Sequence, residues 1–204
     1  MSLLKKAFHE LLENYSSDPV YAESCWVLIE SHYQEPHRHY HTMAHLEAMA
    51  QEAQAIENQL RERDCFWFAL FYHDVIYDPL RQDNEQVSAQ VMQKQLEHSS
   101  FSQVQQVTDL IVATQDHADS EDHDQQLFLD IDLAILGQAP DVYQHYANQI
   151  RAEYHMFPDS LYQAGRKQVL QSLLNRPAIY QTAHFRAKYE TQARINLAEE
   201  LANY

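Results

Sequence analysis

The chain has 204 residues, with 14 lysines and arginines against 30 aspartates and glutamates, and its formal charge is -16 at pH 7. This charge has the wrong sign for binding long nucleic acid or an anionic membrane surface, although a small phosphorylated ligand remains compatible with it. The length suits one domain with a substantial core. We expect a single helical domain over residues 1–204, with a core at about 36–137 and C-terminal helices of 140–204 packed on it.

The composition favours helices throughout. Gly137 and Gly165 are the only two glycines, which leaves little material for tight hairpin turns or for a phosphate-binding loop. Alanine, leucine, glutamine and glutamate are abundant, and all four are good helix formers. The prediction is an all-α bundle of about eight to ten helices.

The two cysteines, Cys25 and Cys65, are too far apart for a CxxC pair, so neither a disulfide framework nor a thiolate zinc site is expected. No signal-peptide core precedes the first helix, and no run approaches about 20 apolar residues. A cytoplasmic protein without membrane contact is the expectation. A homodimer is the default oligomer for an enzyme of this size.

Prolines, glycines and polar runs separate the predicted helices along the chain. Capping boxes are predicted at Asp83 with Gln86, and again at Ser100 with Gln103. The tail is amphipathic. The expected helices cover about 3–12, a second stretch that begins at Pro19 and ends before Pro36, and then 42–60, 64–77, 83–98, 101–114, 127–136, 140–154, 158–176 and 185–201.

The most informative segment is the apolar, aromatic run of 66–72, which leads directly into His73 and Asp74. A buried aspartate or histidine costs several kcal/mol unless it is hydrogen-bonded, paired or bound to a metal. Two readings stay open from this segment alone. Either the polar end of the helix surfaces at residue 73, or a metal ion binds both side chains.

A pair of histidines and a pair of aspartates also have spacings that bear on metal binding. His41 and His45 are four residues apart and would share one helix face if the helix begins early enough, which suits one metal ligand and one neighbour. Asp130 and Asp132 lie within the apolar run 127–136. Because they are only two residues apart, one should turn inward while the other reaches solvent or a backbone amide.

A histidine, an adjacent His-Asp and a distant aspartate, each on its own helix, supply nitrogen and oxygen ligands to one cation. This order resembles the HD-domain superfamily. The resemblance implies that His45, His73, Asp74 and Asp132 bind a metal ion and that His41 donates a proton to the leaving group. The chain is most similar to a subgroup described as predicted metal-dependent HD-superfamily phosphohydrolases of unestablished substrate. The segments that carry the similarity are 38–41, 71–74, 83–85, 128–137 and 150–154.

The chain also departs from relatives within that superfamily. Guanosine tetraphosphate hydrolases carry a Glu-Asp pair shortly after the doublet, where this chain has Tyr77 and Asp78. Asp78 either orients water or simply ends the helix as part of Asp-Pro. His117 stands where two-metal members supply an additional histidine, but it lies in the acidic loop 116–124 and can equally face solvent.

Metal-activated water would explain hydrolysis without a protein nucleophile, and no P-loop or GxSxG elbow is present. Asp74 then serves both as ligand and as catalytic residue, and His41 is the candidate general acid because imidazole titrates near neutral pH. Mixed ligation suits one or two ions of Mn²⁺, Fe²⁺, Zn²⁺, Co²⁺ or Ni²⁺, with Mg²⁺ also compatible. The arginines that could bind a phosphate with two hydrogen bonds are Arg38, Arg81, Arg151 and Arg166, and each can equally pair with an acid at the surface.

The leading hypothesis is a metal-dependent phosphohydrolase that acts on a small, nucleotide-like phosphorylated substrate. Whether the bond is a phosphomonoester, a phosphodiester or a pyrophosphate stays open. The alternatives are a catalytically silent HD-fold module that binds metal or nucleotide, a di-iron HD-type oxygenase, and a helical bundle with incidental histidines.

Overall fold

The structure is a computed structural model that describes residues 2–204. It contains ten α-helices, two 3-10 helices and no strand within those residues, so the all-α prediction is confirmed. None of the helices in this described range is long and apolar enough to cross a membrane. The elements are α1 (Leu3–Glu13), α2 (Pro19–Tyr33), α3 (Met43–Ala55), η1 (Glu57–Gln59), α4 (Arg63–Tyr72), α5 (Asn84–Leu96), α6 (Val104–Ala113), α7 (His123–Asp132), η2 (Leu133–Gly137), α8 (Pro140–Glu153), α9 (Asp159–Asn175) and α10 (Ala183–Leu201).

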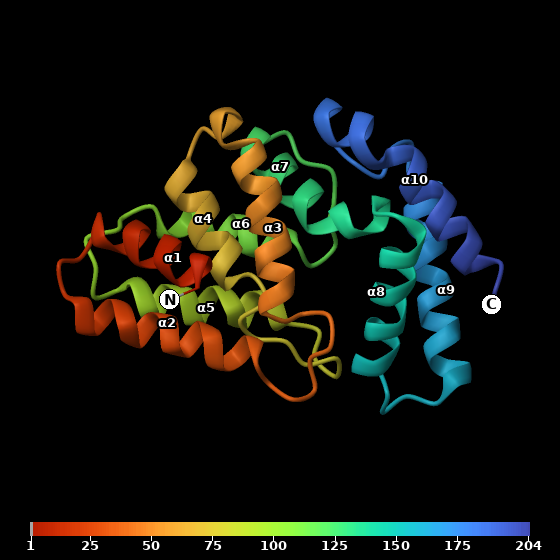
Figure 1. Ribbon diagram of the computed structural model, residues 1–204, viewed down its shortest axis with the longest axis horizontal. Helices are drawn as coiled ribbons and strands as arrows, with labels where there is room; N and C mark the ends of the chain where they lie inside the picture. The colour runs from red at the N-terminus through yellow and green to blue at the C-terminus, as the bar shows by residue number, and fades with distance from the viewer. Residues whose placement is uncertain (1) are drawn as a thin grey trace.

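The helices form two groups, which the segment of α7 and η2 joins. Helices α1 to α6 gather on one side of the molecule, and α8 to α10 stand on the other (Figure 1). Helix α10 lies against η2 and α9, while η2 also contacts α7 and α8. The side chain of Asp132 is at the end of α7 and therefore lies between the two groups.

Helix α4 is the centre of the N-terminal group. Every residue from Cys65 to Tyr72 is buried, and α4 contacts α1, α3, α5, α6 and α7. The ring of Phe71 meets that of Phe8 edge to face at 5.2 Å, and Phe66 meets Phe128 in the same way. A helix surrounded by others needs apolar residues on all faces, which explains the continuous aromatic run.

Helix α4 ends at Tyr72, five residues before the predicted end at Tyr77. The reason is Arg38, whose buried guanidinium donates from Nη1 to the Asp74 carbonyl at 2.6 Å and from Nη2 to the Val75 carbonyl at 3.0 Å. These carbonyls follow the helix and bind a side chain from a distant segment. The bend places His73 and Asp74 beyond the last helical turn.

Other boundaries also differ from the sequence prediction. Asp83 stands at the start of α5, but its carboxylate pairs with Arg81 and makes no capping bond. Helix α6 begins at Val104, because the hydroxyl of Ser100 donates to the Tyr15 carbonyl instead of capping. Helix α3 ends at residue 55 and is followed by η1, whereas the run predicted as 127–136 is α7 followed by η2.

Asp130 attaches α10 to the rest of the fold. Its carboxylate accepts hydrogen bonds from the backbone N–H of Gln181 at 2.6 Å and from the N–H and hydroxyl of Thr182 at 2.8 and 2.6 Å. Thr182 is the N-cap of α10. Of the two acids in the run 127–136, Asp130 therefore binds the start of α10, and Asp132 is the one that can face His45 and His73.

Replacing Gly137 by alanine should destabilise the protein by about 1–3 kcal/mol, because the added Cβ would stand 2.5 Å from Cβ of Tyr189 in α10 and force the two elements apart. Urea unfolding followed by circular dichroism measures the change. Gly165→Ala is the matched control, since a Cβ there meets nothing within 4 Å and the helix should gain about 0.5–1 kcal/mol. Equal effects at both positions would contradict the close contact.

Candidate metal centre

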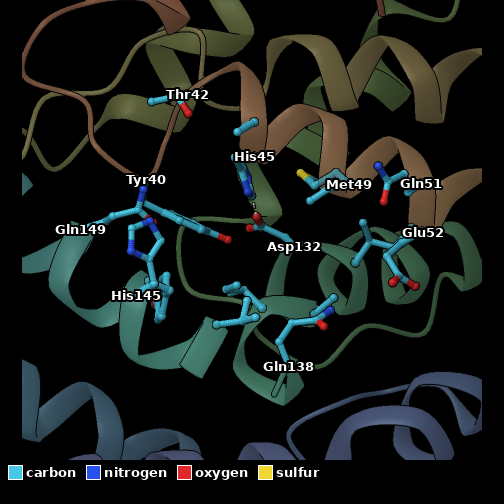
Figure 2. Close-up of a pocket in the computed structure, with 17 residues that line it drawn as sticks. Tyr40, Thr42, His45, Met49, Gln51, Glu52, Asp132, Gln138, His145 and Gln149 are labelled. Atoms are coloured by element: carbon cyan, nitrogen blue, oxygen red, sulfur yellow. Dashed lines mark ion pairs between the residues drawn. The ribbon is translucent and has the colours of Figure 1, made fainter. Parts of the chain in front are cut away.

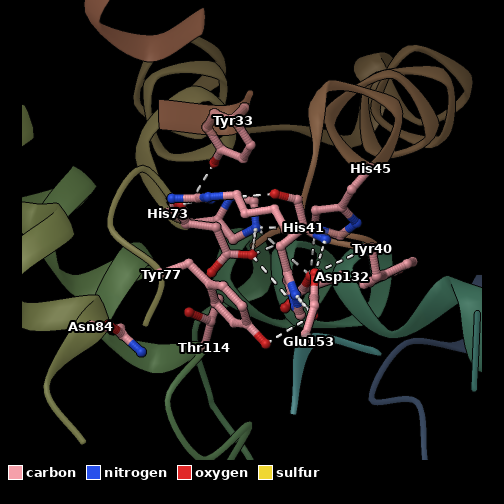
Figure 3. A network of polar contacts seen from close by, with 12 residues as sticks. Tyr33, Tyr40, His41, His45, His73, Tyr77, Asn84, Thr114, Asp132 and Glu153 are labelled. Carbon is pink, nitrogen blue, oxygen red and sulfur yellow. Dashed lines mark hydrogen bonds and ion pairs between the residues drawn. The ribbon is translucent and has the colours of Figure 1, made fainter. Parts of the chain in front are cut away.

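Four of the expected side chains meet where α3, α4 and α7 converge. His45 lies in the first turns of α3, His73 and Asp74 follow α4, and Asp132 ends α7 (Figure 3). The Nε2 atoms of His45 and His73 are 3.2 Å apart, and Nε2 of His73 is 3.1 Å from Oδ2 of Asp74. Within residues 2–204, the ligand atoms of these three residues form a group close enough to hold one metal ion.

Asp132 extends the group on the side of His45. Its Oδ1 atom is 3.3 Å from Nε2 of His45 and 3.8 Å from Nε2 of His73. Its second oxygen, Oδ2, is 2.8 Å from Nε2 of His117. Asp132 thus faces two imidazoles of the centre with one oxygen and a third imidazole with the other.

His117 reaches Asp132 from the loop after α6. Its backbone φ is 49°, in the left-handed region that is unfavourable for a residue with a Cβ. Arg176 donates from Nη1 to the His117 carbonyl at 2.8 Å and from Nη2 to the Asp116 carbonyl at 3.1 Å, so α9 stabilises this backbone. The loop histidine is only partly exposed, and its imidazole faces the Asp132 carboxylate.

The donor set fits a divalent cation. Nδ1 of His73 lies 3.0 Å from the Leu70 carbonyl, an acceptor that keeps a proton on Nδ1 and turns the lone pair of Nε2 toward His45 and Asp74. Burial by itself lowers the pKa of His73, but the Asp74 carboxylate outweighs it and raises the pKa to about 9. The two carboxylates therefore favour positive charge at this point. A divalent metal ion bound here would supply that charge in place of a proton.

The same charges act on the acids. Burial alone would raise the pKa of Asp74, but the imidazoles of His73 and His41 hold it below its ordinary range. Burial would likewise raise the pKa of Asp132, and the contacts with His117 and His45 lower it well below the usual value. Both aspartates are therefore anionic at neutral pH, as metal ligands must be.

His41 precedes α3 and so does not share a helix face with His45, contrary to one reading of the four-residue spacing. Its ring still lies near the centre, with Nε2 4.0 Å from Oδ2 of Asp74. The other ring nitrogen, Nδ1, is 2.7 Å from Oε2 of Glu153, and the ring stacks on Tyr77 at 4.0 Å between centroids. Glu153 and Tyr77 therefore hold the His41 imidazole in place next to Asp74.

Glu153 is a residue of the site that sequence reasoning did not assign. It ends α8 and is fully buried. Its Oε1 atom accepts the backbone N–H groups of His39, Tyr40 and His41 at 2.7–2.9 Å, and Oε2 accepts the Tyr77 hydroxyl at 2.9 Å. The only signal in the sequence was the segment 150–154, which the resemblance included without a role.

The Glu153 contacts set the charges of the pair. Burial would raise the pKa of Glu153, but the His41 hydrogen bond and charge lower it to about 2. For His41, burial lowers the pKa, and the bond to Glu153 together with the nearby Asp74 raises it above the ordinary value. An imidazole that keeps its proton at neutral pH is suited to act as an acid.

The remaining predicted residues are not brought to the centre. Arg38 is buried with its guanidinium bound to backbone carbonyls and to Glu35, so it holds the backbone and does not face a substrate. Arg81 pairs with Asp83 on the surface, and Arg151 pairs with Asp159 at 2.6 Å. Asp78 accepts the N–H of Leu80 in a turn, and because α4 already ends at Tyr72, Asp78 does not end that helix either.

Comparison of the chain with protein-family models, with curated proteins and with solved structures finds no match. The resemblance to the HD superfamily therefore depends on the type and order of the residues in the sequence alone.

Asp74→Ala and His73→Ala should each weaken metal binding by more than about a hundredfold, since loss of a supporting contact alone costs ten- to a hundredfold. Titration calorimetry with Mn²⁺ and elemental analysis of the purified protein measure the effect. His155→Ala, an exposed histidine next to α8, is the control and should bind as the wild type does. Unchanged affinity in both site variants would remove the proposed ligand set.

Glu153 should make the protein less stable in acid. Its pKa is lower in the folded than in the unfolded chain, so its contribution is complete above about pH 5 and is lost as the pH falls toward 2. The lost contribution is about 3 kcal/mol. The difference in unfolding free energy between wild type and Glu153→Gln should therefore shrink between pH 6 and pH 2.5, whereas a constant difference would contradict the assignment. The exposed Glu13→Gln is the control.

Proposed function

We propose that the protein is a metal-dependent phosphohydrolase of the HD superfamily that cleaves a small phosphate ester with water. The observation that carries the proposal is the meeting of His45, His73 and Asp74 around one point, with Asp132 beside them. His41 stands at the edge of this group, 4.0 Å from Asp74. Ligands on one side and a proton donor on the other are the two parts that ester hydrolysis requires.

The residues that would hold the ion are His45, His73, Asp74 and Asp132. A bound divalent cation supplies Lewis acidity, which lowers the pKa of an adjacent water and neutralises charge on the phosphoryl oxygens. The protein contributes orientation. The Leu70 carbonyl fixes the tautomer of His73. The apolar side chains of α4 keep water away from the ligands, and electrostatic interactions are stronger where water is scarce.

His41 is the general acid. In hydrolysis the water oxygen forms a bond to phosphorus while the bond from phosphorus to the ester oxygen breaks and leaves its electron pair on that oxygen. The proton on His41 converts this oxygen to an alcohol, and the proton released by the water restores the imidazolium or remains on the phosphate. Glu153 keeps the ring oriented through Nδ1, so that Nε2 faces the centre.

A second candidate is oxidation of a substrate by a di-iron centre. The bond between His117 and Asp132 favours it, because this pair can take part in a second metal site next to the first. Two irons per chain in elemental analysis, with oxygen consumption in the presence of a substrate, would favour oxidation over hydrolysis. Nucleotide binding with no product under any of several metals would instead favour a silent binding module.

Asp74→Ala should abolish hydrolysis of a panel of phosphate esters by the metal-loaded protein, because it removes a ligand and a charge at the centre. Phosphate release measures the rate. His155 is exposed and is not one of the candidate site residues, so His155→Ala should keep wild-type activity. Hydrolysis that survives Asp74→Ala would place the activity elsewhere.

His41→Ala should lower kcat by about 10²–10⁴-fold for alkyl phosphates, since their leaving alcohols need a proton. The loss should be much smaller for p-nitrophenyl phosphate, whose leaving group is stable as an anion. Comparing the two substrates in wild type and variant tests the role. An equal loss for both would show that His41 acts in some way other than by donating a proton to the leaving group.

A further inference from the structure

A cavity of about 400 Å³ opens beside the metal centre, and both His45 and Asp132 lie on its wall (Figure 2). Three helical faces enclose it. Residues 45, 48, 49 and 52 of α3 and residues 142, 145, 146 and 149 of α8 follow the spacing of one helix face, and residues from the end of α7 through η2 close the third side. Its size is within the range for small-molecule sites.

The cavity is lined without any lysine or arginine within the described residues 2–204. Its acidic side chains are Asp132 and Glu52. Glu52 is already neutralised by Lys188, whose Nζ lies 2.7 and 2.9 Å from its two oxygens. A group that occupies this space therefore meets no lysine or arginine. The basic side chains on the wall are the imidazoles of His45 and His145, and the one negative charge without a lysine or arginine partner is that of Asp132 at the metal centre.

Two arginines that contact the backbone of Asp74 and His117 already have partners. The guanidinium of Arg38 is bound to the carbonyls of Asp74 and Val75, and that of Arg176 to the carbonyls of Asp116 and His117. A single phosphoryl group can be balanced by the metal ion and by His41. With one ion bound, a second phosphate next to Asp132 would have no lysine or arginine as a partner, and its negative charge would be repelled by the carboxylate.

The cavity wall is suited to a flat, uncharged group. Tyr40 and Tyr146 contribute aromatic rings and pack edge to face at 4.7 Å, while Met49 and Ala134 add apolar surface. The amide nitrogens of Gln138 and Gln149 donate to the Tyr189 hydroxyl and to the His39 carbonyl, which leaves their amide oxygens as acceptors at the wall. Aromatic and apolar surface with a few amides is the composition that binds a heterocycle with polar edges.

We propose that this cavity binds the organic part of the substrate, and that the substrate is a phosphate ester with one phosphoryl group and an uncharged, nucleoside-like leaving group. The inference rests on the proposed function. It excludes pyrophosphates and nucleoside di- and triphosphates as preferred substrates. The bond that breaks joins phosphorus to the nucleoside oxygen, which leaves as an alcohol with the His41 proton, while the water oxygen remains on the phosphate.

The first test is binding of adenosine to the full chain by titration calorimetry, with and without Mn²⁺. Ala48 is exposed on α3 and lines the cavity, so Ala48→Trp should fold while filling the space. We expect saturable binding that weakens by about tenfold or more in Ala48→Trp. Ala55→Trp, at an exposed position of the same helix outside the cavity, is the matched control and should bind as the wild type does. Absence of adenosine binding by the wild type, or equal binding by both variants, overturns the inference.

The second test compares kcat/KM for adenosine monophosphate, adenosine diphosphate and pyrophosphate with the Mn²⁺-loaded protein. The monophosphate should be preferred by about tenfold or more. Val142→Lys places a cation on the exposed side of the wall and should narrow this preference. A preference for the diphosphate or pyrophosphate overturns the inference. If adenosine binds but none of the compounds is hydrolysed, the proposed function fails while the occupant of the cavity is supported.

Discussion

Two partly buried carboxylates facing two buried imidazoles impose the constraint on which this structure depends. Asp74 and Asp132 stand 3.1–3.8 Å from the Nε2 atoms of His45 and His73, in a place that water reaches poorly. Such charges are stable only with positive charge between them, and the raised pKa of His73 expresses that need. The apolar helix α4 carries His73 to this point and surrounds it with rings, so the core of the fold and the metal centre are built on the same element.

A second layer of contacts keeps the ligands in place. Arg38 binds the backbone that follows α4, and Glu153 binds the backbone that precedes α3. The two segments that carry Asp74 and His41 are thus held by side chains from elsewhere in the chain. Because Glu153 ends α8, the C-terminal helices contribute directly to the site, and the cavity between α3, η2 and α8 exists only where the two groups of helices meet.

Much of the fold could be predicted because helix periodicity and breakers are local properties. The helices over 140–154, 158–176 and 185–201 differ from the structure by only one or two residues. Boundaries were wrong where a distant side chain intervened, as at Tyr77, where Arg38 binds carbonyls beyond the true end of α4. The capping boxes at Asp83 and Ser100 did not form because their side chains have other partners, Arg81 and the Tyr15 carbonyl.

The sequence by itself determined the helical class and the order of the candidate metal ligands, since both follow from residue type and spacing. Only the tertiary structure decided which groups meet. It gave Asp130 to the start of α10 and Asp132 to the centre, brought His117 to Asp132, and made Glu153 the partner of His41. It also bound the Arg38 guanidinium to backbone carbonyls, so that this side chain is not available to bind a phosphate. Hydrogen bonds and charges act over a few ångströms in space, and a contact across more than a hundred residues leaves no periodic signal in the chain.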